Sequence, residues 1–296
     1  MPGKKAVVRI MLCLVIILLA FSALVGSLVF SKSARNFAIA AISENTIKKE
    51  TNITYGPDNR HRLDIYKPDA ENKNTPLVIF YYGGGWTAGN RDLYHFVGAA
   101  LAKKGYTTII PDYRLYPEVK FPEFVNDAAL AYQWAWQKFV KDQSASRSII
   151  LIGHSAGAHI GALLSYDKTY LNNLGTEIPR PDGFIGLAGP YAFDPTTWHS
   201  TKEIFSTAKN ADQARPIAFV DSSSPKTLLI HGVDDTTVRM WNANELSEKL
   251  SKNKVENQLV KLQGIGHLGI VTSIAKPLRW RASVLDEMVS FIRKFP

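Results

Sequence analysis

The sequence predicts an α/β fold in which helices cover both faces of a mostly parallel sheet. Two observations lead to this prediction. From residue 51 onward, short apolar runs alternate with longer stretches in which apolar residues recur at helical spacing, and this alternation is typical of α/β proteins. The apolar runs are rich in β-branched residues and are bounded by turn residues, as expected of parallel strands that are buried on both faces.

The predicted elements follow one another along the chain. Residues 32–49 are expected to form a short connecting or amphipathic helix. Residues 62–66, in which Leu63 and Ile65 alternate with polar residues, are expected to form an antiparallel edge strand. Segment 190–224 is rich in Pro, Asp, Thr and Ser and is predicted to be a small cap inserted over a site. The predicted buried parallel strands are residues 77–82, 107–111, 148–152, 183–187, 227–230 and 258–262, and the predicted helices are residues 93–103, 123–141, 156–164, 242–251 and 282–294.

The composition is that of a globular protein with a sizeable hydrophobic core. Of the 296 residues, 46% are hydrophobic and 21% are charged, so packing alone can stabilise the fold. The formal net charge is +9, but much of it comes from a few basic residues near the N-terminus, and no later cluster interleaves Lys and Arg with aromatic residues. We therefore expect no nucleic-acid partner. The basic residues before residue 36 are Lys4, Lys5, Arg9, Lys32 and Arg35.

An uncharged apolar run occupies residues 10–30, and basic residues precede it. At about 1.5 Å per residue, this run is long enough to cross a hydrocarbon core of about 30 Å. It is longer than the apolar stretch of about 7 to 15 residues in a cleavable signal peptide, so the sequence favours an uncleaved signal anchor over a cleaved signal. The excess of positive charge before the run predicts a cytoplasmic N-terminus and an extracytoplasmic domain. Cleavage would instead make the protein secreted or periplasmic.

The chain is thus expected to divide into two parts. Residues 1–35 form the membrane segment and linker, and residues 36–296 form one catalytic domain. The single cysteine, Cys13, lies in the apolar run. The domain is therefore expected to contain neither a disulfide nor a Cys-type zinc site.

A candidate nucleophile lies between a predicted strand and a predicted helix. Residues 153–157 read Gly-His-Ser-Ala-Gly, and G-x-S-x-G in this context forms a sharp turn that exposes the serine at the carboxyl end of the strand. Gly153 and Gly157 flank Ser155 at positions where such a turn leaves no room for a Cβ. The sequence therefore predicts Ser155 as the nucleophile.

A serine hydroxyl needs a base to take its proton, and the base needs a carboxylate to orient it. For a serine presented in this way, the acid comes next in the chain and the histidine last. Asp235 lies in the loop after strand 227–230 and is the preferred acid, with the adjacent Asp234 as the alternative. His267 lies in a glycine-rich turn just past strand 258–262, and the other six histidines all precede the end of the acid loop.

Backbone donors for a developing oxyanion are expected in the glycine-rich loop after strand 77–82. Residues 83–86 read Gly-Gly-Gly-Trp, and glycines let backbone N–H groups face a substrate without obstruction. The amides of Gly84, Gly85 and Ala156 are the predicted oxyanion hole. A phosphate-binding loop is the competing interpretation, but the loop lacks the spacing and the following Lys-Ser/Thr of such loops.

With these motifs assigned, the chain resembles the esterase branch of the α/β hydrolases, which includes hormone-sensitive-lipase-like and feruloyl-esterase-like proteins, and it is similar to kynurenine formamidase. The resemblance runs from Leu63-Asp64-Ile65-Tyr66 to the C-terminus and includes residues 111–115 (Pro-Asp-Tyr-Arg-Leu) and 122–127. It implies the α/β-hydrolase fold, with a mostly parallel eight-stranded sheet and a small cap. In relatives, the arginine and aspartate of the last two segments usually serve structure.

One position departs from this branch. Relatives generally have histidine where this chain has Tyr82, and a phenol cannot reproduce both hydrogen bonds of an imidazole. The backbone donors do not depend on that side chain, so the expected activity is retained. Aromatic residues are also expected to line a substrate pocket. The candidates are Tyr81, Tyr82, Trp86, His154 and Trp198.

The sequence thus predicts a serine carboxylesterase that acts on small to medium acyl esters through an acyl-enzyme. No metal and no organic cofactor is expected, and the expected partners are a small-molecule ester and a membrane. An aryl formamidase or a peptidase of the same fold is an alternative. A non-catalytic membrane-tethered binding protein is another, although such a module would be expected to lose a member of the triad.

Overall fold

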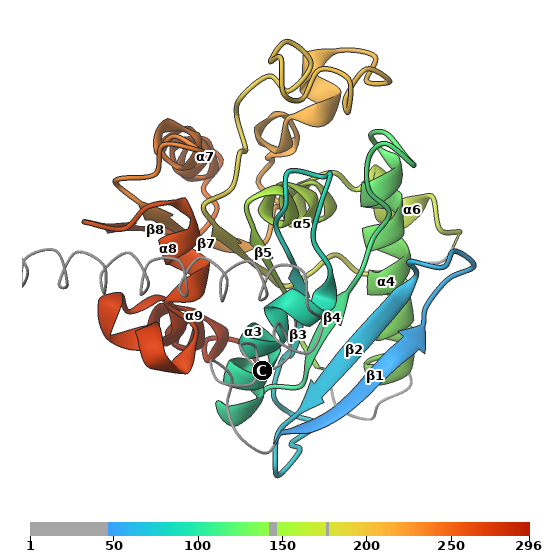
Figure 1. Cartoon of the computed structure of the whole chain (residues 1–296), viewed down its shortest axis with the longest axis vertical. Helices are drawn as coiled ribbons and strands as arrows, with labels where there is room; N and C mark the ends of the chain where they lie inside the picture. The colour runs from blue at the N-terminus through green and yellow to red at the C-terminus, as the bar shows by residue number, and fades with distance from the viewer. Residues whose placement is uncertain (1–46, 142–146, 176–177) are drawn as a thin grey trace, which may run out of the picture.

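The computed structural model describes residues 47–141, 147–175 and 178–296, which form an eight-stranded sheet with helices packed around it (Figure 1). The strands lie in the order β1-β2-β4-β3-β5-β6-β7-β8. The first two pairings, β1 with β2 and β2 with β4, are antiparallel, and all later pairings are parallel. The strands are β1 (Lys48–Thr54), β2 (Arg62–Lys67), β3 (Leu77–Tyr81), β4 (Thr108–Pro111), β5 (Ile149–His154), β6 (Gly183–Leu187), β7 (Lys226–Gly232) and β8 (Asn257–Leu262).

Helices connect the parallel strands, as the alternating pattern predicts. The α-helices are α3 (His95–Lys103), α4 (Glu123–Phe139), α5 (Ala156–Tyr166), α6 (Thr169–Asn172), α7 (Trp241–Lys252), α8 (His267–Thr272) and α9 (Val284–Ile292). The described part of the chain also contains four 3-10 helices: η1 (Arg91–Tyr94), η2 (Ala211–Ala214), η3 (Pro216–Phe219) and η4 (Lys276–Arg281). The short helices α6 and α8 were not predicted, because a single turn leaves no periodic pattern to detect.

Helices cover both faces of the sheet, and successive side chains of a strand contact them by pointing to opposite faces. The Tyr81 hydroxyl donates to the Ala128 carbonyl oxygen of α4 at 2.8 Å. The neighbouring Phe80 points the opposite way and contacts Tyr94, next to α3, with ring centroids 5.6 Å apart. The fold predicted from the sequence, a mostly parallel sheet with helices on both faces, is thereby confirmed.

The two edges of the sheet differ from the prediction. Residues 62–66 are not an edge strand, because β1 pairs with β2 on its outer side. β1 reads KKETNIT and is largely exposed, so it carries no apolar alternation that could reveal it. Lys48 and Lys49, predicted to end a helix, begin this strand, and residues 32–46 of that prediction lie outside the described residues. At the other edge, β8 is only partly buried, contrary to the prediction.

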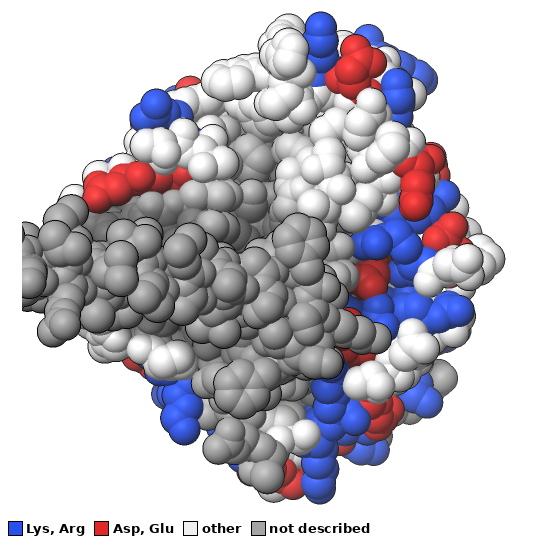
Figure 2. All heavy atoms as spheres, in the orientation of Figure 1, with Lys and Arg blue, Asp and Glu red and all other residues white. Residues whose placement is uncertain are grey.

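No helix within the described ranges combines the length and apolarity needed to cross a membrane. The predicted membrane segment, residues 10–30, lies outside those ranges. Figure 2 shows acidic and basic side chains interspersed along the edge that carries β1 and β2. That edge of the visible face therefore has no patch of a single sign.

Three histidines are neutral in the folded protein near pH 7, and of these His154 and His159 are buried and His95 is partly buried. Burial lowers the pKa of His95 to about 4, assisted by the charge of Lys49. It also lowers the pKa of His154 to about 3, assisted by His267, and the pKa of His159 to about 4. In the unfolded chain these groups titrate near pH 6.5. Between about pH 4 and 6.5 the unfolded state therefore binds more protons than the folded state.

We expect the free energy of unfolding to rise with pH through this window and to level off above it, with each histidine contributing at most about 1.4 kcal/mol per pH unit. Urea unfolding at several pH values measures the slope. His159→Gln keeps a donor for the Ala214 carbonyl oxygen, which His159 Nε2 contacts at 2.8 Å, but removes one titrating group. Its slope should be shallower than that of the wild type, and equal slopes would contradict the assignment.

Candidate active site

Ser155 occupies a sharp turn between β5 and α5. Its φ of 54° and ψ of −120° place a non-glycine residue in a backbone region that costs about 1 to 3 kcal/mol. The Ser155 amide donates to the Leu187 carbonyl oxygen at the end of β6, at 2.9 Å. The turn thus places the hydroxyl beyond the carboxyl ends of the central strands.

The two glycines that flank the serine are required by close backbone approach. A Cβ on Gly157 would lie 2.1 Å from the Tyr81 carbonyl oxygen, and a Cβ on Gly153 would lie 2.3 Å from the Gly157 carbonyl oxygen. Neither contact is sterically possible. The G-x-S-x-G spacing therefore reflects the fit of the first turn of α5 against β3 and β5.

The structure brings the three side chains of the predicted triad together. His267 Nε2 lies 2.9 Å from Ser155 Oγ, and His267 Nδ1 lies 2.7 Å from Asp235 Oδ2. Ser155 follows β5, Asp235 follows β7, and His267 follows β8 as the first residue of α8. The carboxyl ends of these parallel strands meet at one edge of the sheet, which is why residues up to 112 positions apart make contact.

Asp235 is held in place by its own loop. Its Oδ1 accepts hydrogen bonds from the amides of Thr237 and Val238 at 2.9 and 2.8 Å. Burial by itself raises the pKa of Asp235, but the hydrogen bonds from His267 and from the Val238 amide outweigh burial and keep the pKa below its usual value. The carboxylate is therefore ionised near neutral pH. Asp234, the alternative acid, is exposed, and it is Asp235 that reaches His267.

Two further histidines, His231 and His154, lie close to Asp235 and His267, and both are neutral. Burial lowers the pKa of His231, whose Nε2 lies 2.8 Å from the Val238 carbonyl oxygen and 3.5 Å from Asp235 Oδ2. The His154 ring centroid lies 5.1 Å from that of His267. Because the pKa of His154 is about 3, its ring does not oppose a positive charge on His267.

The glycine loop after β3 lies against the nucleophile. A Cβ on Gly83 would lie 3.0 Å from Ser155 Cβ. Gly84, Gly85 and Trp86 all have positive φ values, of 138°, 60° and 61°. A Cβ on Gly84 would lie 2.0 Å from the Ala88 carbonyl oxygen, so only glycine fits there.

The third predicted donor comes from helix α5. Ala156 is the first residue of α5, so its amide is one of the N–H groups that have no partner inside the helix. The structure thus places all three predicted oxyanion donors, Gly84, Gly85 and Ala156, on the two segments that flank Ser155.

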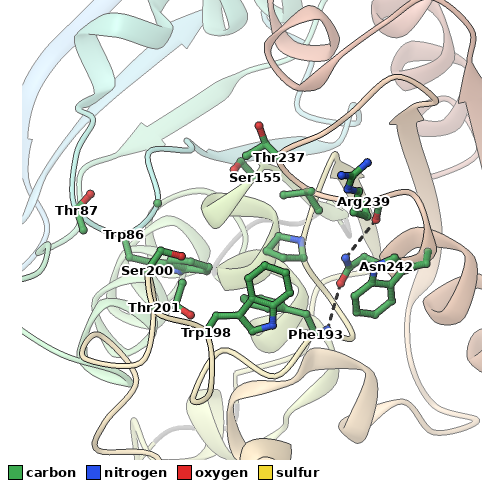
Figure 3. Close-up of a pocket in the computed structure, with 14 residues that line it drawn as sticks. Trp86, Thr87, Ser155, Phe193, Trp198, Ser200, Thr201, Thr237, Arg239 and Asn242 are labelled. Atoms are coloured by element: carbon green, nitrogen blue, oxygen red, sulfur yellow. Dashed lines mark hydrogen bonds between the residues drawn. The ribbon is translucent and has the colours of Figure 1, made fainter.

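A cavity of about 380 Å³ opens beside Ser155 (Figure 3). Trp86 and Trp198 line it, as predicted. Tyr81, Tyr82 and His154 do not, because all three side chains are buried in the core. Adjacency to the predicted site motifs in sequence suggested them, but Tyr81 packs against α4, and Tyr82 and His154 contact Tyr94 instead of the cavity. The lining residues are Gly85, Trp86, Thr87, Ser155, Pro190, Phe193, Trp198, Ser200, Thr201, Thr237, Val238, Arg239, Trp241 and Asn242.

Segment 190–224, predicted to be a cap, supplies one wall of this cavity through Phe193, Trp198 and Thr201. It connects β6 to β7 along the chain, and Figure 1 shows it above α5. Asn242 of α7 holds the beginning of segment 190–224 in place, because Asn242 Oδ1 accepts hydrogen bonds from the amides of Ala192 and Phe193 at 3.1 and 3.2 Å.

Comparison with known proteins agrees with this architecture. Residues 63–180 match the BD-FAE family and residues 184–295 the prolyl oligopeptidase family. Among solved structures, a truncated carbohydrate esterase from gut microbiota has a TM-score of 0.70 at 22% identity, covering 85% of this chain and 98% of that one. Esterase B from Lactobacillus rhamnosis has a TM-score of 0.71 at 20% identity, covering 93% and 94%. The chain has the α/β-hydrolase fold.

Curated relatives of this chain are named esterases and a formamidase. A probable isoprenylcysteine alpha-carbonyl methylesterase of Oryza sativa is 24% identical, covering 81% of this chain and 63% of that protein. Esterase LipC of Mycobacterium tuberculosis is 28% identical, covering 73% and 58%. Kynurenine formamidase of Danio rerio is 28% identical, covering 48% and 46%. The chain thus spans about three fifths of the length of the first two relatives.

Several residues of the α/β-hydrolase cavity were not predicted. Thr237, Arg239, Trp241 and Asn242 lie a few residues after Asp235, and this proximity in sequence is the signal that might have found them. Phe193 belongs to the cap, where no periodic pattern orients side chains. Arg239 is the one charged side chain among the described residues that line the cavity.

Proposed function

We propose that this α/β hydrolase cleaves carboxylic esters through a covalent acyl-enzyme. The observation that carries the proposal is the continuous hydrogen-bonded line from Asp235 through His267 to Ser155, with spacings of 2.7 and 2.9 Å. A base within hydrogen-bond reach of a hydroxyl, itself oriented by a carboxylate, is the arrangement that activates serine. The esterase names of several relatives and structural neighbours support the same chemistry.

The residues divide the reaction between them. Ser155 Oγ attacks the ester carbonyl carbon while His267 Nε2 takes the hydroxyl proton, and Asp235 stabilises the imidazolium that forms. The amides of Gly84, Gly85 and Ala156 accommodate the negative oxygen of the tetrahedral intermediate. His267 then gives its proton to the departing alcohol oxygen, which leaves an acyl-Ser155 ester. A water molecule, deprotonated by His267, hydrolyses that ester and restores the hydroxyl.

The cavity supports substrates of small to medium size. Its volume of about 380 Å³ lies at the lower end of the usual range for ligand sites, about 300 to 1,000 Å³. Its walls include Trp86, Phe193, Trp198 and Trp241, which favour an apolar or aromatic group. An ester of a short acyl chain or of an aryl alcohol fits these properties.

Aryl formamide hydrolysis is a second candidate, favoured by the likeness to kynurenine formamidase of Danio rerio. The same triad would attack a formyl carbon in place of an ester carbon. Peptide cleavage is the third, favoured by the match of residues 184–295 to the prolyl oligopeptidase family. A non-catalytic binding protein has no need for a serine with strained backbone in contact with an oriented histidine, so this alternative has less support.

We further propose that residues 10–30 anchor the protein in a membrane and leave the hydrolase domain, residues 36–296, on the extracytoplasmic side. This rests on the uncharged length of the run and on Lys4, Lys5 and Arg9 before it.

Hydrolysis of a series of p-nitrophenyl acyl esters tests the reaction. We expect turnover to be highest for short chains and to fall as the acyl group outgrows the cavity. Ser155→Ala should lower kcat/KM by at least about 10⁴-fold, because the nucleophile is lost. Hydrolysis rates on N-formylaniline and on peptidyl p-nitroanilides, measured in parallel, test the formamidase and peptidase alternatives. Equal rates for the wild type and Ser155→Ala would reject the mechanism.

The choice of acid is tested by a matched pair of substitutions. Asp235→Asn should keep the local structure but lower kcat by about 10⁴-fold, because the amide cannot stabilise the imidazolium or hold the productive tautomer. Asp234→Asn makes the same chemical change one residue away, at an exposed position, and should leave kcat nearly unchanged. The reverse ranking would assign the acid to Asp234.

Membrane attachment is tested by fractionating cells that express the full chain or residues 36–296. The full chain should sediment with membranes and resist extraction by salt and alkaline carbonate, and the shorter chain should not. Protease added outside the inner membrane should degrade the domain of the full chain. Recovery of the full chain in the cytosolic fraction would contradict the anchor.

A further inference from the structure

The side chain of Tyr82 lies beneath the glycine loop and is completely buried. Its hydroxyl donates to Asp112 Oδ1 at 2.8 Å and accepts from Arg60 Nη2 at 3.1 Å. Burial, followed by the charge of Asp112, raises the pKa of Tyr82 well above its usual value, so the phenol keeps the proton that it donates. Although a phenol is not an imidazole, the Tyr82 hydroxyl here donates one hydrogen bond and accepts another.

Two side chains that contact Tyr82, those of Tyr113 and Arg60, hold the two ends of the loop that runs from Gly83 to Gly89. At the first end, the Tyr113 hydroxyl donates to the Tyr82 carbonyl oxygen at 2.7 Å. At the second end, Arg60 Nη2 donates to the Gly89 carbonyl oxygen at 3.0 Å. A Cβ on Gly89 would lie 2.9 Å from the Tyr82 ring, so the loop closes directly onto that ring.

Asp112 anchors this arrangement to the sheet. It follows β4, is buried, and forms a salt bridge with the Arg91 guanidinium. Its Oδ1 also accepts from the Arg91 amide at 2.7 Å. The Tyr82 ring itself is stacked between Tyr113 and Tyr94, with centroids 4.7 and 5.5 Å away. The ring therefore has little freedom to shift.

Within the loop, the amides of Thr87 and Ala88 both donate to the Gly84 carbonyl oxygen, at 3.2 and 3.0 Å. These bonds define the shape of the loop but not its position relative to Ser155. The position depends on the two ends. Donors to an oxyanion must lie about 2.7 to 3.1 Å from it, so a small displacement of the ends is sufficient to weaken them.

We propose that Arg60, Tyr82 and Asp112, which we call the Tyr82 network, are positioning residues that set the amides of Gly84 and Gly85 against the carbonyl oxygen of the substrate. This inference rests on the proposed ester hydrolysis. It goes beyond that proposal because it assigns a role in the reaction to three side chains that do not line the cavity.

The test compares Tyr82→Phe with Tyr81→Phe. Both tyrosines are completely buried, but the Tyr81 hydroxyl donates to the Ala128 carbonyl oxygen on the other side of the sheet. With p-nitrophenyl butyrate, Tyr82→Phe should lower kcat by about 10- to 100-fold, as expected when oxyanion donors are displaced. KM should change little, because the cavity is intact. Tyr81→Phe should keep the kcat of the wild type.

A trifluoromethyl ketone that matches the acyl chain gives a readout that a purely structural role would not change. It adds to the serine as a hemiketal whose oxyanion needs the loop amides, whereas the corresponding methyl ketone binds without forming much of that oxyanion. Tyr82→Phe should lower the affinity for the trifluoromethyl ketone by the same factor by which it lowers kcat/KM. Its affinity for the methyl ketone should equal that of the wild type. Parallel weakening of both ketones, or equal kcat in Tyr82→Phe and Tyr81→Phe, would overturn the inference.

Folding of each variant is checked by near-ultraviolet circular dichroism and thermal unfolding. Should Tyr82→Phe fail to fold, Arg60→Gln replaces it, since it removes the contacts with Tyr82 and Gly89 at a half-buried position. If neither variant folds, the network is structural only and the inference fails. An inactive wild type would reject the proposed ester hydrolysis and this inference with it, whereas an active wild type with a normal Tyr82→Phe rejects the inference alone.

Discussion

A serine with a φ of 54° holds an unfavourable backbone conformation, and three neighbouring strands keep it there. β5 leads into Ser155, the end of β6 accepts its amide hydrogen bond, and β3 supplies the Tyr81 carbonyl oxygen against which Gly157 packs. Because β3 and β6 both pair with β5 in parallel register, the strain is supported by the most buried part of the sheet. The direction of the serine hydroxyl follows from this turn.

The groups that surround the serine come from separate strands, and each is oriented by its own local contacts. Two backbone amides orient Asp235, which in turn orients His267. The neutral state of His154 and His231 leaves Asp235 to compensate the charge that His267 acquires. The cap contributes one wall of the cavity, and Asn242 ties it to α7. The proposed catalytic groups thus lie just beyond the carboxyl ends of the strands, and the cap residues that line the cavity lie on loops.

Features that depend on strong local patterns were predictable from the sequence. Seven strands have apolar or alternating composition, and Gly153 and Gly157 mark the turn that contains Ser155. β1 escaped prediction because an exposed edge strand has no apolar face to reveal it. The partial burial of β8 was missed because a sequence run does not say whether a strand lies at the centre or at the edge.

The site was only partly predictable for a different reason. Asp235 and His267 follow from chain order, but the choice against Asp234 depends on which way each carboxylate points. Tyr82 was assigned to the cavity because it adjoins the glycine loop, whereas its ring stacks on Tyr94 and Tyr113 and does not line the cavity. Residues 237–242 and the cap line the cavity through tertiary packing that leaves no periodic signature in the chain.

His267 follows β8, the edge strand that is paired on one side only and only partly buried. Ser155, in contrast, follows a strand that is flanked on both sides. Edge elements open with a smaller free-energy cost than the core of a domain, so separation of the base from the nucleophile does not require global unfolding. On warming, we therefore expect this edge to fray and to separate His267 from Ser155 before the domain melts cooperatively.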